Sequence, residues 1–487
     1  MPFASLRAFV AELEKKGELV RVKTPVSARL EITEITDRVV KRGGPALLFE
    51  NVTGADYPVA INLFGKAERM AFALGVNDVN EIARRIEEML DLEAAASKRG
   101  LLSKLSLLPK LLEAASFPPR HVKSGPVQEE VREGGDVDLA RLPVLWCWPD
   151  DGGPFITLPL VITKDPVTGQ RNMGMYRMQV FDRNTTGMHW HRHKVGAAHF
   201  RKAKELGRRL EAAVALGGDP ALTYAATAPL PQAIDEFLFT DFLRGRPVEL
   251  IPAKTVDLEV PADADIVLEG YVDPAEEPRM EGPFGDHTGF YSLADYYPVF
   301  HVTAMTTRRD AIYPATIVGR PPMEDYWLGH ATERIFGPLA RLLLPEIVDY
   351  HMPPEGVFHN LVFVSIDKQY PGHAFKVAQG MLGIGLLMLA KTIVVLDRDV
   401  NVQDATEAWW VALNNIDPER DVKFTFGPAD VLDHASRAFT YGSKMIIDAT
   451  RKWPEEGFTR EWPERIRMDE KTKKFVDERW GEYGIRL

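Results

Sequence analysis

The eleven residues from Met280 to Phe290 constrain the fold of this chain more than any other segment of similar length. They read Met-Glu-Gly-Pro-Phe-Gly-Asp-His-Thr-Gly-Phe, with glycine or proline at positions 282, 283, 285 and 289. This density of glycine and proline excludes a helix and disfavours a central strand, so it predicts a shaped loop. The loop carries two carboxylates, Glu281 and Asp286. Two acids in unequal surroundings suit proton chemistry, and a solvated turn with ordinary surface acids is the alternative.

Composition narrows the class of protein. The chain has 487 residues, 45% of them hydrophobic, and a formal net charge of −11. It is long enough to bury several cores, and its acidic balance gives no electrostatic footprint for nucleic acid. Cys147 is the only cysteine, which excludes an intrachain disulfide and favours a reducing compartment. The start of the chain reads as an amphipathic helix with Leu6 and Leu13 on one face, not as a signal peptide, so we expect a cytoplasmic enzyme.

The most apolar segment runs from Met381 to Leu396. Gly383, Gly385 and Lys391 interrupt it, and the unbroken part is shorter than the roughly 20 residues of a membrane span. The pattern predicts a buried helix ending near Ala390 and then a core strand over 392–396. No transmembrane segment is expected.

Hydrophobic periodicity predicts a mixed α+β and α/β multidomain chain. Residues 1–118 alternate helix and strand patterns, with a helical connection expected from Leu101 to Leu112, and prolines 118 and 119 mark a boundary. Residues 119–318 read as a β-meander or barrel, interrupted by one helix predicted from Ala197 to Leu216. Residues 319–452 return to α/β character. Residues 453–487 form a charged, Trp-rich tail that suggests a peripheral segment or an interface arm.

Arg177 is the first candidate binding residue of the β-rich part. It lies on the strand predicted from Arg171 to Phe181, among apolar neighbours and on the opposite face from Asn172. An arginine in such surroundings needs an anion. The anion is either a bound carboxylate or phosphate, or the partner in a structural ion pair.

A run of alternating histidines follows. His189, His191 and His193 lie at every second position of a strand predicted over 186–193, so they could share one face and bind a metal. A basic strand end is the other interpretation, because Lys194 comes next. Glu236 lies on a helix predicted over 234–242, whose acids would ordinarily form a solvated face. The usual phosphate-loop and dinucleotide motifs are missing from the sequence.

Taken together, these segments resemble the UbiD family of prenylated-FMN-dependent decarboxylases. The resemblance runs nearly end to end, and the Glu281–Gly289 motif is its most specific part. The nearest subgroup is that of the 3-polyprenyl-4-hydroxybenzoate decarboxylases of quinone biosynthesis. The matching segments are Leu30–Ile35, Gly43–Glu50, Asn172–Arg177, Glu281–Gly289, Gly319–Pro322 and Gly442–Met445.

The resemblance implies a catalytic trio of Arg177, Glu281 and Asp286. In such enzymes the last acid donates a proton to the decarboxylated carbon, so this role falls on Asp286, and Glu281 pairs with Arg177. A general acid must be protonated at working pH, so we expect burial or a neighbouring like charge to raise the pKa of Asp286.

The resemblance also implies the cofactor and its metal. Mn²⁺, with K⁺ nearby, would tie the phosphate of prenylated FMN to the protein through Asn172, His193 and Glu236, a ligand set that suits Mn²⁺ better than Zn²⁺. Lys391 is a further candidate for a phosphate contact. The positions that match the family's cofactor-contacting stretches are Asn172, Met175, Tyr176, Arg177, His189, Trp190, His191, Lys194 and Val195.

The fold implied by the family is an N-terminal α/β domain, a central split β-barrel of flavin-reductase type that carries the cofactor, and a C-terminal α/β oligomerisation domain. The implied partners are an aromatic acid, a flavin prenyltransferase of UbiX type as cofactor supplier, and further copies of the chain in a dimer or hexamer. Peripheral association with the inner face of the membrane stays open.

Two departures from the ubiquinone-type pattern widen the choice of substrate. Those members tend to carry Arg-Trp-Leu where this chain has His189-Trp190-His191, and Met178 replaces a polar residue. A menaquinone-pathway naphthoate and a small phenolic or heteroaromatic acid are therefore alternative substrates. Outside the family, the residues alone also allow a metal-dependent hydrolase or a non-catalytic scaffold.

Overall fold

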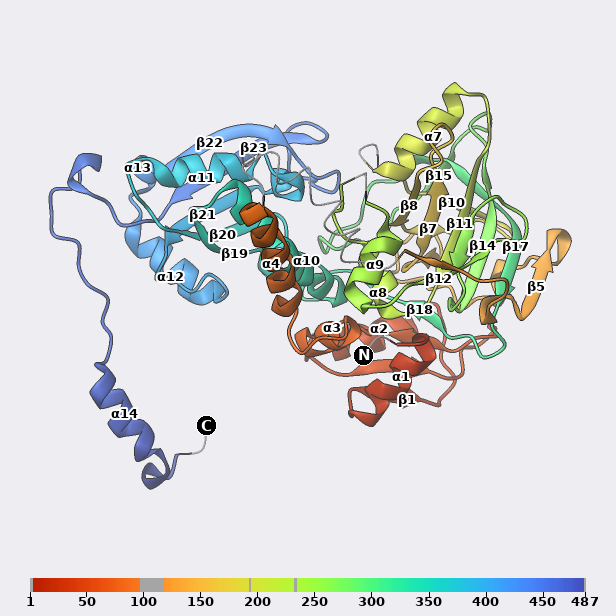
Figure 1. The fold of residues 1–487 in the computed structure, drawn as a ribbon, viewed down its shortest axis with the longest axis horizontal. Coiled ribbons are helices and arrows are strands. Elements are labelled where there is room, and N and C mark those ends of the chain that lie inside the picture. The colour runs from red at the N-terminus through yellow and green to blue at the C-terminus, as the bar shows by residue number, and fades with distance from the viewer. Residues whose placement is uncertain (1–2, 97–117, 192–193, 232–233, 486–487) are drawn as a thin grey trace.

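The computed structural model describes residues 3–96, 118–191, 194–231 and 234–485. In Figure 1 the sheet of the C-terminal part lies on one side and the large central sheet on the other, with the N-terminal helices and strands packed below the central sheet. The helical connection predicted from Leu101 to Leu112 falls outside the described residues.

The N-terminal part confirms the alternation of helices and strands. Ser5 caps the first helix by accepting a hydrogen bond from the N–H of Ala8 (3.2 Å), and Leu6, Phe9 and Leu13 are buried on the predicted face. Four strands form one sheet, and its last strand comes from a distant part of the chain: β1 (Leu19–Val22), β2 (Ala46–Phe49), β3 (Val59–Ile61) and β18 (Tyr313–Ala315). The helices are α1 (Leu6–Lys15), α2 (Glu31–Val40), α3 (Ala67–Ala73) and α4 (Asn80–Ala96).

The central sheet is antiparallel throughout, in the order β10-β17-β14-β11-β7-β8, with β5 paired to β17. Its strands are β5 (Glu130–Glu133), β7 (Leu160–Lys164), β8 (Arg171–Met175), β10 (Thr185–Gly187), β11 (Leu210–Leu216), β14 (Ile266–Val272) and β17 (Val299–Thr307). Three small sheets surround it, made of β4 (Arg120–His121), β12 (Glu249–Pro252) and β13 (Glu259–Pro261); β6 (Phe155–Ile156) and β9 (Met178–Gln179); and β15 (Arg279–Glu281) and β16 (Asp295–Tyr297). Three helices complete this part: α7 (Val195–Glu205), α8 (Pro220–Ala225) and α9 (Glu236–Arg244).

The helix predicted from Ala197 to Leu216 is wrong in its second half. Helix α7 ends at Glu205, Gly207 follows in the left-handed conformation (φ +61°), and residues 210–216 form β11. The segment Leu-Glu-Ala-Ala-Val-Ala-Leu has good helix formers, but it lies between β7 and β14, where every residue except Glu211 is buried. Tertiary burial therefore overrides local helix propensity.

The strand predicted over 186–193 is also too long. Strand β10 ends at Gly187, so His189 and His191 lie on irregular backbone. His193 falls outside the described residues. The prediction that alternate positions of a strand place these histidines on one face is therefore wrong for His189 and His191.

The C-terminal part has a five-stranded mixed sheet in the order β19-β20-β21-β23-β22. Helix α11 ends at Met381, earlier than predicted, and after Gly385 (φ +43°) a short 3₁₀ turn leads to the predicted core strand β21. The strands are β19 (Ile347–His351), β20 (Leu361–Ile366), β21 (Thr392–Asp397), β22 (Val422–Pro428) and β23 (Tyr441–Asp448). The helices are α10 (Glu324–Leu343), α11 (His373–Met381), α12 (Ala405–Asn415) and α13 (Pro418–Asp421).

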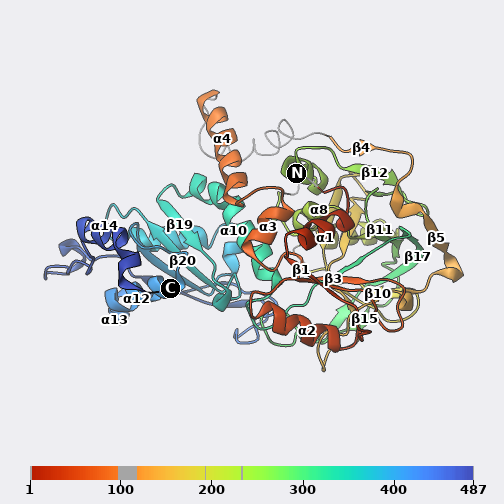
Figure 2. The ribbon, with the colours of Figure 1, turned by 90° about the horizontal axis from the view of Figure 1, so that it is seen from below.

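Helices α4 and α10 pack against each other where the N-terminal and C-terminal parts meet, as Figures 1 and 2 show from two sides. The tail extends away from the sheets and carries α14 (Glu470–Glu478) at its far end in Figure 1. Within the described ranges, every helix is too short or too polar to cross a membrane.

Candidate active site

Arg177 lies in the break between β8 and β9, where its side chain is largely buried beside the loop of residues 281–292 that carries both acids (the acid loop). Its Nε donates to Oε1 of Glu281 (3.1 Å), one Nη pairs with Asp286, and the other donates to Oγ of Ser292 (3.1 Å). The guanidinium also lies over the ring of Phe284, 4.7 Å from its centroid. The guanidinium of Arg177 therefore contacts both carboxylates of the loop, Glu281 and Asp286.

The segment 282–292 is a shaped loop, as its glycines and prolines predict. It leaves β15 at Glu281, and the N–H of Asp286 donates to the carbonyl of Phe290 (3.1 Å). Gly285 allows a close approach to Trp148, because a Cβ there would lie 2.2 Å from Cδ1 of the indole. Backbone hydrogen bonds and close packing thus hold the two carboxylates on either side of Arg177.

His189 is a second partner of Glu281. Its Nδ1 lies 2.9 Å from Oε1 and 3.0 Å from Oε2 of the carboxylate, and its Nε2 lies 2.7 Å from Nε2 of His191. The ring of Tyr297 covers His189 at 4.2 Å between centroids. Burial, reinforced by Arg177, lowers the pKa of His189, so a neutral imidazole lies against Glu281.

The expected rise in the pKa of Asp286 is wrong for this state of the protein. Burial alone would raise it, but Arg177 and the hydrogen-bonded His287 outweigh burial and hold the pKa of Asp286 below its ordinary value. Nδ1 of His287 lies 2.9 Å from Oδ1 of Asp286, and its Nε2 lies 3.0 Å from Nε2 of His359. Burial would lower the pKa of His287, but the Asp286 carboxylate raises it above its ordinary value. The acidic proton of this pair therefore resides on the imidazole.

A second polar cluster lies where β8 meets α9. The carboxylate of Glu236 accepts the N–H of Met173 (2.8 Å), and burial raises the pKa of Glu236 to about 8. Asn172 is buried on β8, and its Nδ2 has no hydrogen-bond partner among the described residues. An unpaired amide N–H needs an acceptor such as a phosphate oxygen, whereas a buried carboxylate is stabilised by a cation, so the two groups mark a place for an anionic ligand together with a cation.

The remaining predicted contacts gather around the start of α7. Tyr176 is buried, and Nε1 of Trp190 is buried without a hydrogen-bond partner in the part of the chain that the structure describes. Lys194 precedes α7 and Val195 begins it. A Cβ on Gly196 would lie 2.6 Å from Nε1 of Trp190, so this glycine admits the indole.

Lys391 lies in the C-terminal part, directly before β21. Its Nζ pairs with Asp433 (2.9 Å), and the next residue, His434, packs its ring 4.4 Å from that of Phe290 on the acid loop. Lys391 thus lies near the acid loop in two ways: through the segment 433–434, and through its N–H, which donates to the carbonyl of Asn360 (2.9 Å) beside His359.

Sequence reasoning missed two close neighbours of the trio, His287 and Ser292. His287 directly follows Asp286 in the motif, so its proximity was readable from the sequence. Ser292 carried no such signal, because only the return of the loop brings its Oγ to Arg177 and to the N–H of Phe284 (3.2 Å).

The chain matches models of a known protein family along most of its length. Models of three UbiD domains match the chain in order: the 3-octaprenyl-4-hydroxybenzoate carboxy-lyase N-terminal domain over residues 10–89, its Rift-related domain over 120–321 and its C-terminal domain over 326–449. The chain belongs to the UbiD family. UbiD-class enzymes are carboxy-lyases, so this UbiD protein is a decarboxylase. The hydrolase and scaffold alternatives are thereby set aside.

Similar proteins span the whole UbiD chain. An uncharacterized protein of Aquifex aeolicus is 54% identical over 485 residues, 99% of both chains. The UbiD-class enzyme HmfF from Pelotomaculum thermopropionicum, solved with FMN, is 31% identical with a TM-score of 0.80, covering 97% of this chain and 99% of that one. An evolved dimeric form of HmfF with prFMN is 30% identical with a TM-score of 0.78, covering 96% and 98%. Vanillic acid decarboxylase of Sedimentibacter hydroxybenzoicus, in its closed form, is 27% identical with a TM-score of 0.83, covering 99% of each. The mixed α+β multidomain fold is confirmed.

Proposed function

We propose that this chain decarboxylates an aromatic carboxylic acid with prenylated FMN as its cofactor. The reaction replaces the carboxylate by a proton: the bond from the ring to the carboxyl carbon breaks, carbon dioxide leaves, and a C–H bond forms. The observation that carries the proposal is the buried Arg177, which contacts both Glu281 and Asp286. A cation that can bind a substrate carboxylate thus lies beside a group that can carry a proton.

The residues around β8, α9 and α7 fit a flavin phosphate with a metal. A cation would stabilise the charged form of Glu236, whose pKa burial raises, and Asn172 would offer its Oδ1 to the metal while its unpaired Nδ2 donates to a phosphate oxygen. With His193 they would hold Mn²⁺, which accepts such mixed ligands, and K⁺ would lie nearby. Lys194 and the N-terminus of α7 would hold the phosphate, as helix N-termini do elsewhere. Tyr176 and the His189–His191 segment would line the cofactor.

Prenylated FMN, when bound, supplies the electron sink that side chains lack. The protein groups then have two tasks, to hold the substrate and to move a proton. Arg177 would grip the substrate carboxylate through its fork, and Glu281, fixed by His189 at 2.9 Å, would keep Arg177 oriented. Phe284 beneath the guanidinium and Tyr297 over His189 would keep water from the reacting carbon.

Asp286 would deliver the proton after a change of partner. In the structure it is paired with Arg177, and it receives a hydrogen bond from His287. A substrate carboxylate that competes for Arg177 removes the charge that holds the pKa of Asp286 down. The proton on His287 can then pass to Asp286, and His359 beyond it offers a route for reprotonation from the C-terminal part.

The substrate we propose first is 3-polyprenyl-4-hydroxybenzoate of quinone biosynthesis. Large apolar side chains are exposed on and beside the acid loop, with Phe290 59% and Leu293 80% exposed and Tyr296 on the neighbouring β16. Such a surface would accept a long apolar tail. The second candidate is a small phenolic acid, favoured by the similarity to vanillic acid decarboxylase over 99% of the chain. A menaquinone-pathway naphthoate is the third.

We also propose the family's organisation for this chain. The domains would be residues 1–118, 119–318 and 319–452, with the tail 453–487 as an arm, and the central sheet would curl into a split barrel. A flavin prenyltransferase would supply the cofactor, and the chain would assemble as a dimer or hexamer in the cytoplasm.

A co-expression experiment tests the proposed reaction and substrate together. The protein is produced with a flavin prenyltransferase, its visible spectrum and manganese content are recorded, and carbon dioxide release is measured. The substrates are 4-hydroxybenzoate with and without a 3-prenyl chain, vanillate and hydroxynaphthoate. The first proposal predicts that a longer 3-prenyl chain lowers KM. Turnover of vanillate alone would transfer the assignment to small phenolic acids, and no turnover by fully loaded enzyme would contradict the use of these substrate classes.

A further inference from the structure

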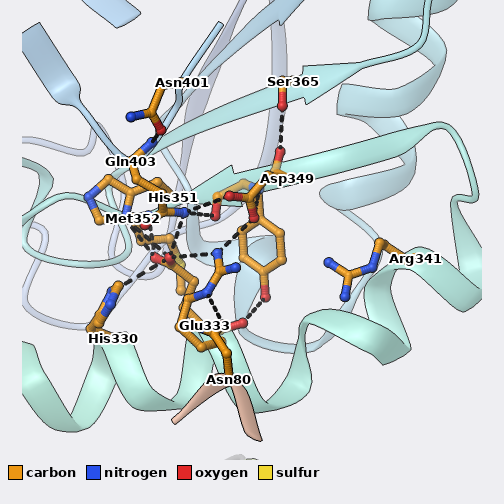
Figure 3. A network of polar contacts seen from close by, with 12 residues as sticks. Asn80, His330, Glu333, Arg341, Asp349, His351, Met352, Ser365, Asn401 and Gln403 are labelled. Carbon is orange, nitrogen blue, oxygen red and sulfur yellow. Dashed lines mark hydrogen bonds and ion pairs between the residues drawn. The ribbon is translucent and has the colours of Figure 1, made fainter. Parts of the chain in front are cut away.

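Three side chains of types that can bind a metal converge at the start of the C-terminal part, on elements other than the acid loop. His330 and Glu333 are three residues apart on α10, so they lie on the same helix face, and His351 ends the neighbouring strand β19. Figure 3 shows the three side chains pointing toward one another from these two elements. None of them takes part in the reaction proposed above.

The spacing of their ligand atoms suits a small metal ion. Nδ1 of His351 lies 3.1 Å from Oε1 of Glu333, and Nδ1 of His330 lies 3.6 Å from the same oxygen. One ligand atom from each of the three lies within 4.8 Å of the other two. Tetrahedral Zn²⁺ with bonds of about 2.1 Å places its ligand atoms about 3.4 Å apart. The two distances to Glu333 therefore differ from the tetrahedral spacing by only a few tenths of an ångström, and the ligand atoms of His330 and His351 start no more than 4.8 Å apart.

His330 gives an independent indication that a ligand belongs here. Its Nδ1 is buried and makes no hydrogen bond to any residue that the structure describes, although it lies on the side of Glu333. His330 also lines a cavity of about 310 Å³ formed by α3, α10 and the segment 77–80, which would give an ion access to the His330 side of the cluster. Buried polar atoms are normally paired, and this atom would be paired by a metal.

Other contacts hold the cluster in place. Glu333 is fully buried, and its Oε2 accepts the N–H of Met352 (2.6 Å). Gln403 bridges Oδ2 of Asp349 (3.0 Å) and Oε1 of Glu333 (3.5 Å). Such outer contacts orient metal ligands in known sites. Arg334 acts against a cation, with its Nη1 3.8 Å from Oε1 of Glu333, but the same nitrogen is engaged at 2.7 Å by Asp349.

We propose that His330, Glu333 and His351 form a binding site for a divalent transition-metal ion, with Zn²⁺ as the best fit. Two imidazoles and one carboxylate are a known zinc set that leaves one coordination position for water, here on the side of the cavity. The ion would join α10 to β19 beside α4, to which Arg334 already reaches through Asn80 (3.0 Å). The competing interpretation is a metal-free network in which Nδ1–H of His351 donates to Glu333.

Zinc binding by the full-length chain separates the two interpretations. Glu236→Gln serves as the parent, because it removes a ligand of the metal site proposed for the cofactor. After chelation and dialysis, Zn²⁺ binding is measured by equilibrium dialysis, and the visible spectrum is recorded with Co²⁺. His330→Ala is the informative variant, since Nδ1 of His330 makes no hydrogen bond that folding would lose. His121→Ala, at an exposed histidine of β4, is the matched control.

The proposal predicts one equivalent of Zn²⁺ per chain in the parent and in its His121→Ala variant. The His330→Ala variant should bind at least about tenfold more weakly and lose the tetrahedral Co²⁺ spectrum. Equal binding with and without His330, or no binding by a folded parent, overturns it. If Glu236→Gln does not fold, zinc-edge anomalous diffraction from zinc-soaked wild-type crystals decides, by the presence or absence of a peak between the three side chains.

Discussion

Arg177→Met is the perturbation that most directly tests how the acid pair is held. Methionine keeps much of the aliphatic stem and removes the guanidinium. Glu281, whose side chain is fully buried, then keeps only His189 as a side-chain partner, and Asp286 keeps His287. Removing one partner of a buried ion pair leaves the other charge unpaired in a medium that solvates it poorly.

The expected loss follows from the geometry. At the 3.1 Å between Nε of Arg177 and Oε1 of Glu281, the Coulomb attraction is about 5 kcal/mol at an effective dielectric constant of about 20. Breaking buried pairs costs about 3–5 kcal/mol in practice. Amides exchange when the structure opens locally, so the exchange rate rises tenfold for each 1.36 kcal/mol by which the free energy of opening falls. A fall of about 3 kcal/mol therefore speeds exchange by about 150-fold.

Native-state hydrogen exchange measured by mass spectrometry is the appropriate assay, because a multidomain chain does not unfold in one step. Peptides covering 172–181 and 279–292 should exchange about 150-fold faster or more, and peptides of β20 and β21 should not change. The matched control is Arg279→Met, which removes an exposed arginine 3.3 Å from Asp182 and should cost at most about 1 kcal/mol. If the two substitutions speed amide exchange equally, the ion pairs of Arg177 do not stabilise this region more than an exposed pair does.

The same variant has a predicted pH dependence. The folded pKa of Asp286 is below its unfolded value, so its contribution to stability is present above the unfolded value of about 3.9 and is lost as the pH falls through the folded one. Arg177→Met removes the main cause of that shift. The difference in exchange between wild type and variant should therefore be largest near neutral pH and should shrink below about pH 4. A difference that grows on acidification would contradict the assigned charges.

Three further outcomes are expected. Asn172→Ala and Glu236→Ala should each lower the flavin and manganese content of protein co-expressed with the prenyltransferase, measured by absorption and metal analysis; full occupancy in both would remove them as ligands. Asp286 raises the pKa of His287, so the proton-supplying imidazolium persists above pH 6.5 and turnover should fall as the pH rises beyond it. His287→Asn should abolish this limb of the pH–rate profile, and an unchanged profile would exclude His287 as the supplier. Gly285→Ala should lower turnover by displacing the loop from Trp148, and a variant as active as wild type would show that the loop tolerates the shift.

The acid loop was the most predictable part of the site. Glycine and proline act through local sterics, so the loop between Glu281 and Ser292 could be expected from the residues alone. The amphipathic helix α1 and the strand β21 were predictable for the same reason, since their patterns are local. Sequence periodicity could not identify β11, because a strand buried on both faces has no alternation and its alanines also suit a helix.

Electrostatics was the least predictable part. The expectation of a raised pKa for Asp286 rested on burial, which is present, but the sign of the shift depends on where Arg177 and His287 point. His189 was taken for one of three alternate strand residues, whereas β10 ends before it and its ring turns toward Glu281. Such directions are set by tertiary contacts that no single segment contains.

In the proposed mechanism Asp286, released from Arg177, gives its proton to the carbon that loses carbon dioxide. The most direct measurement is the rate of carbon dioxide release by wild type and by Asp286→Asn, both co-expressed with a flavin prenyltransferase and matched in cofactor content by absorption. The mechanism predicts that wild type releases carbon dioxide and arene in equal amounts. It also predicts that Asp286→Asn keeps its cofactor but turns over at least about 100-fold more slowly, which is the lower range for loss of a general acid. Equal rates at equal cofactor content would contradict it.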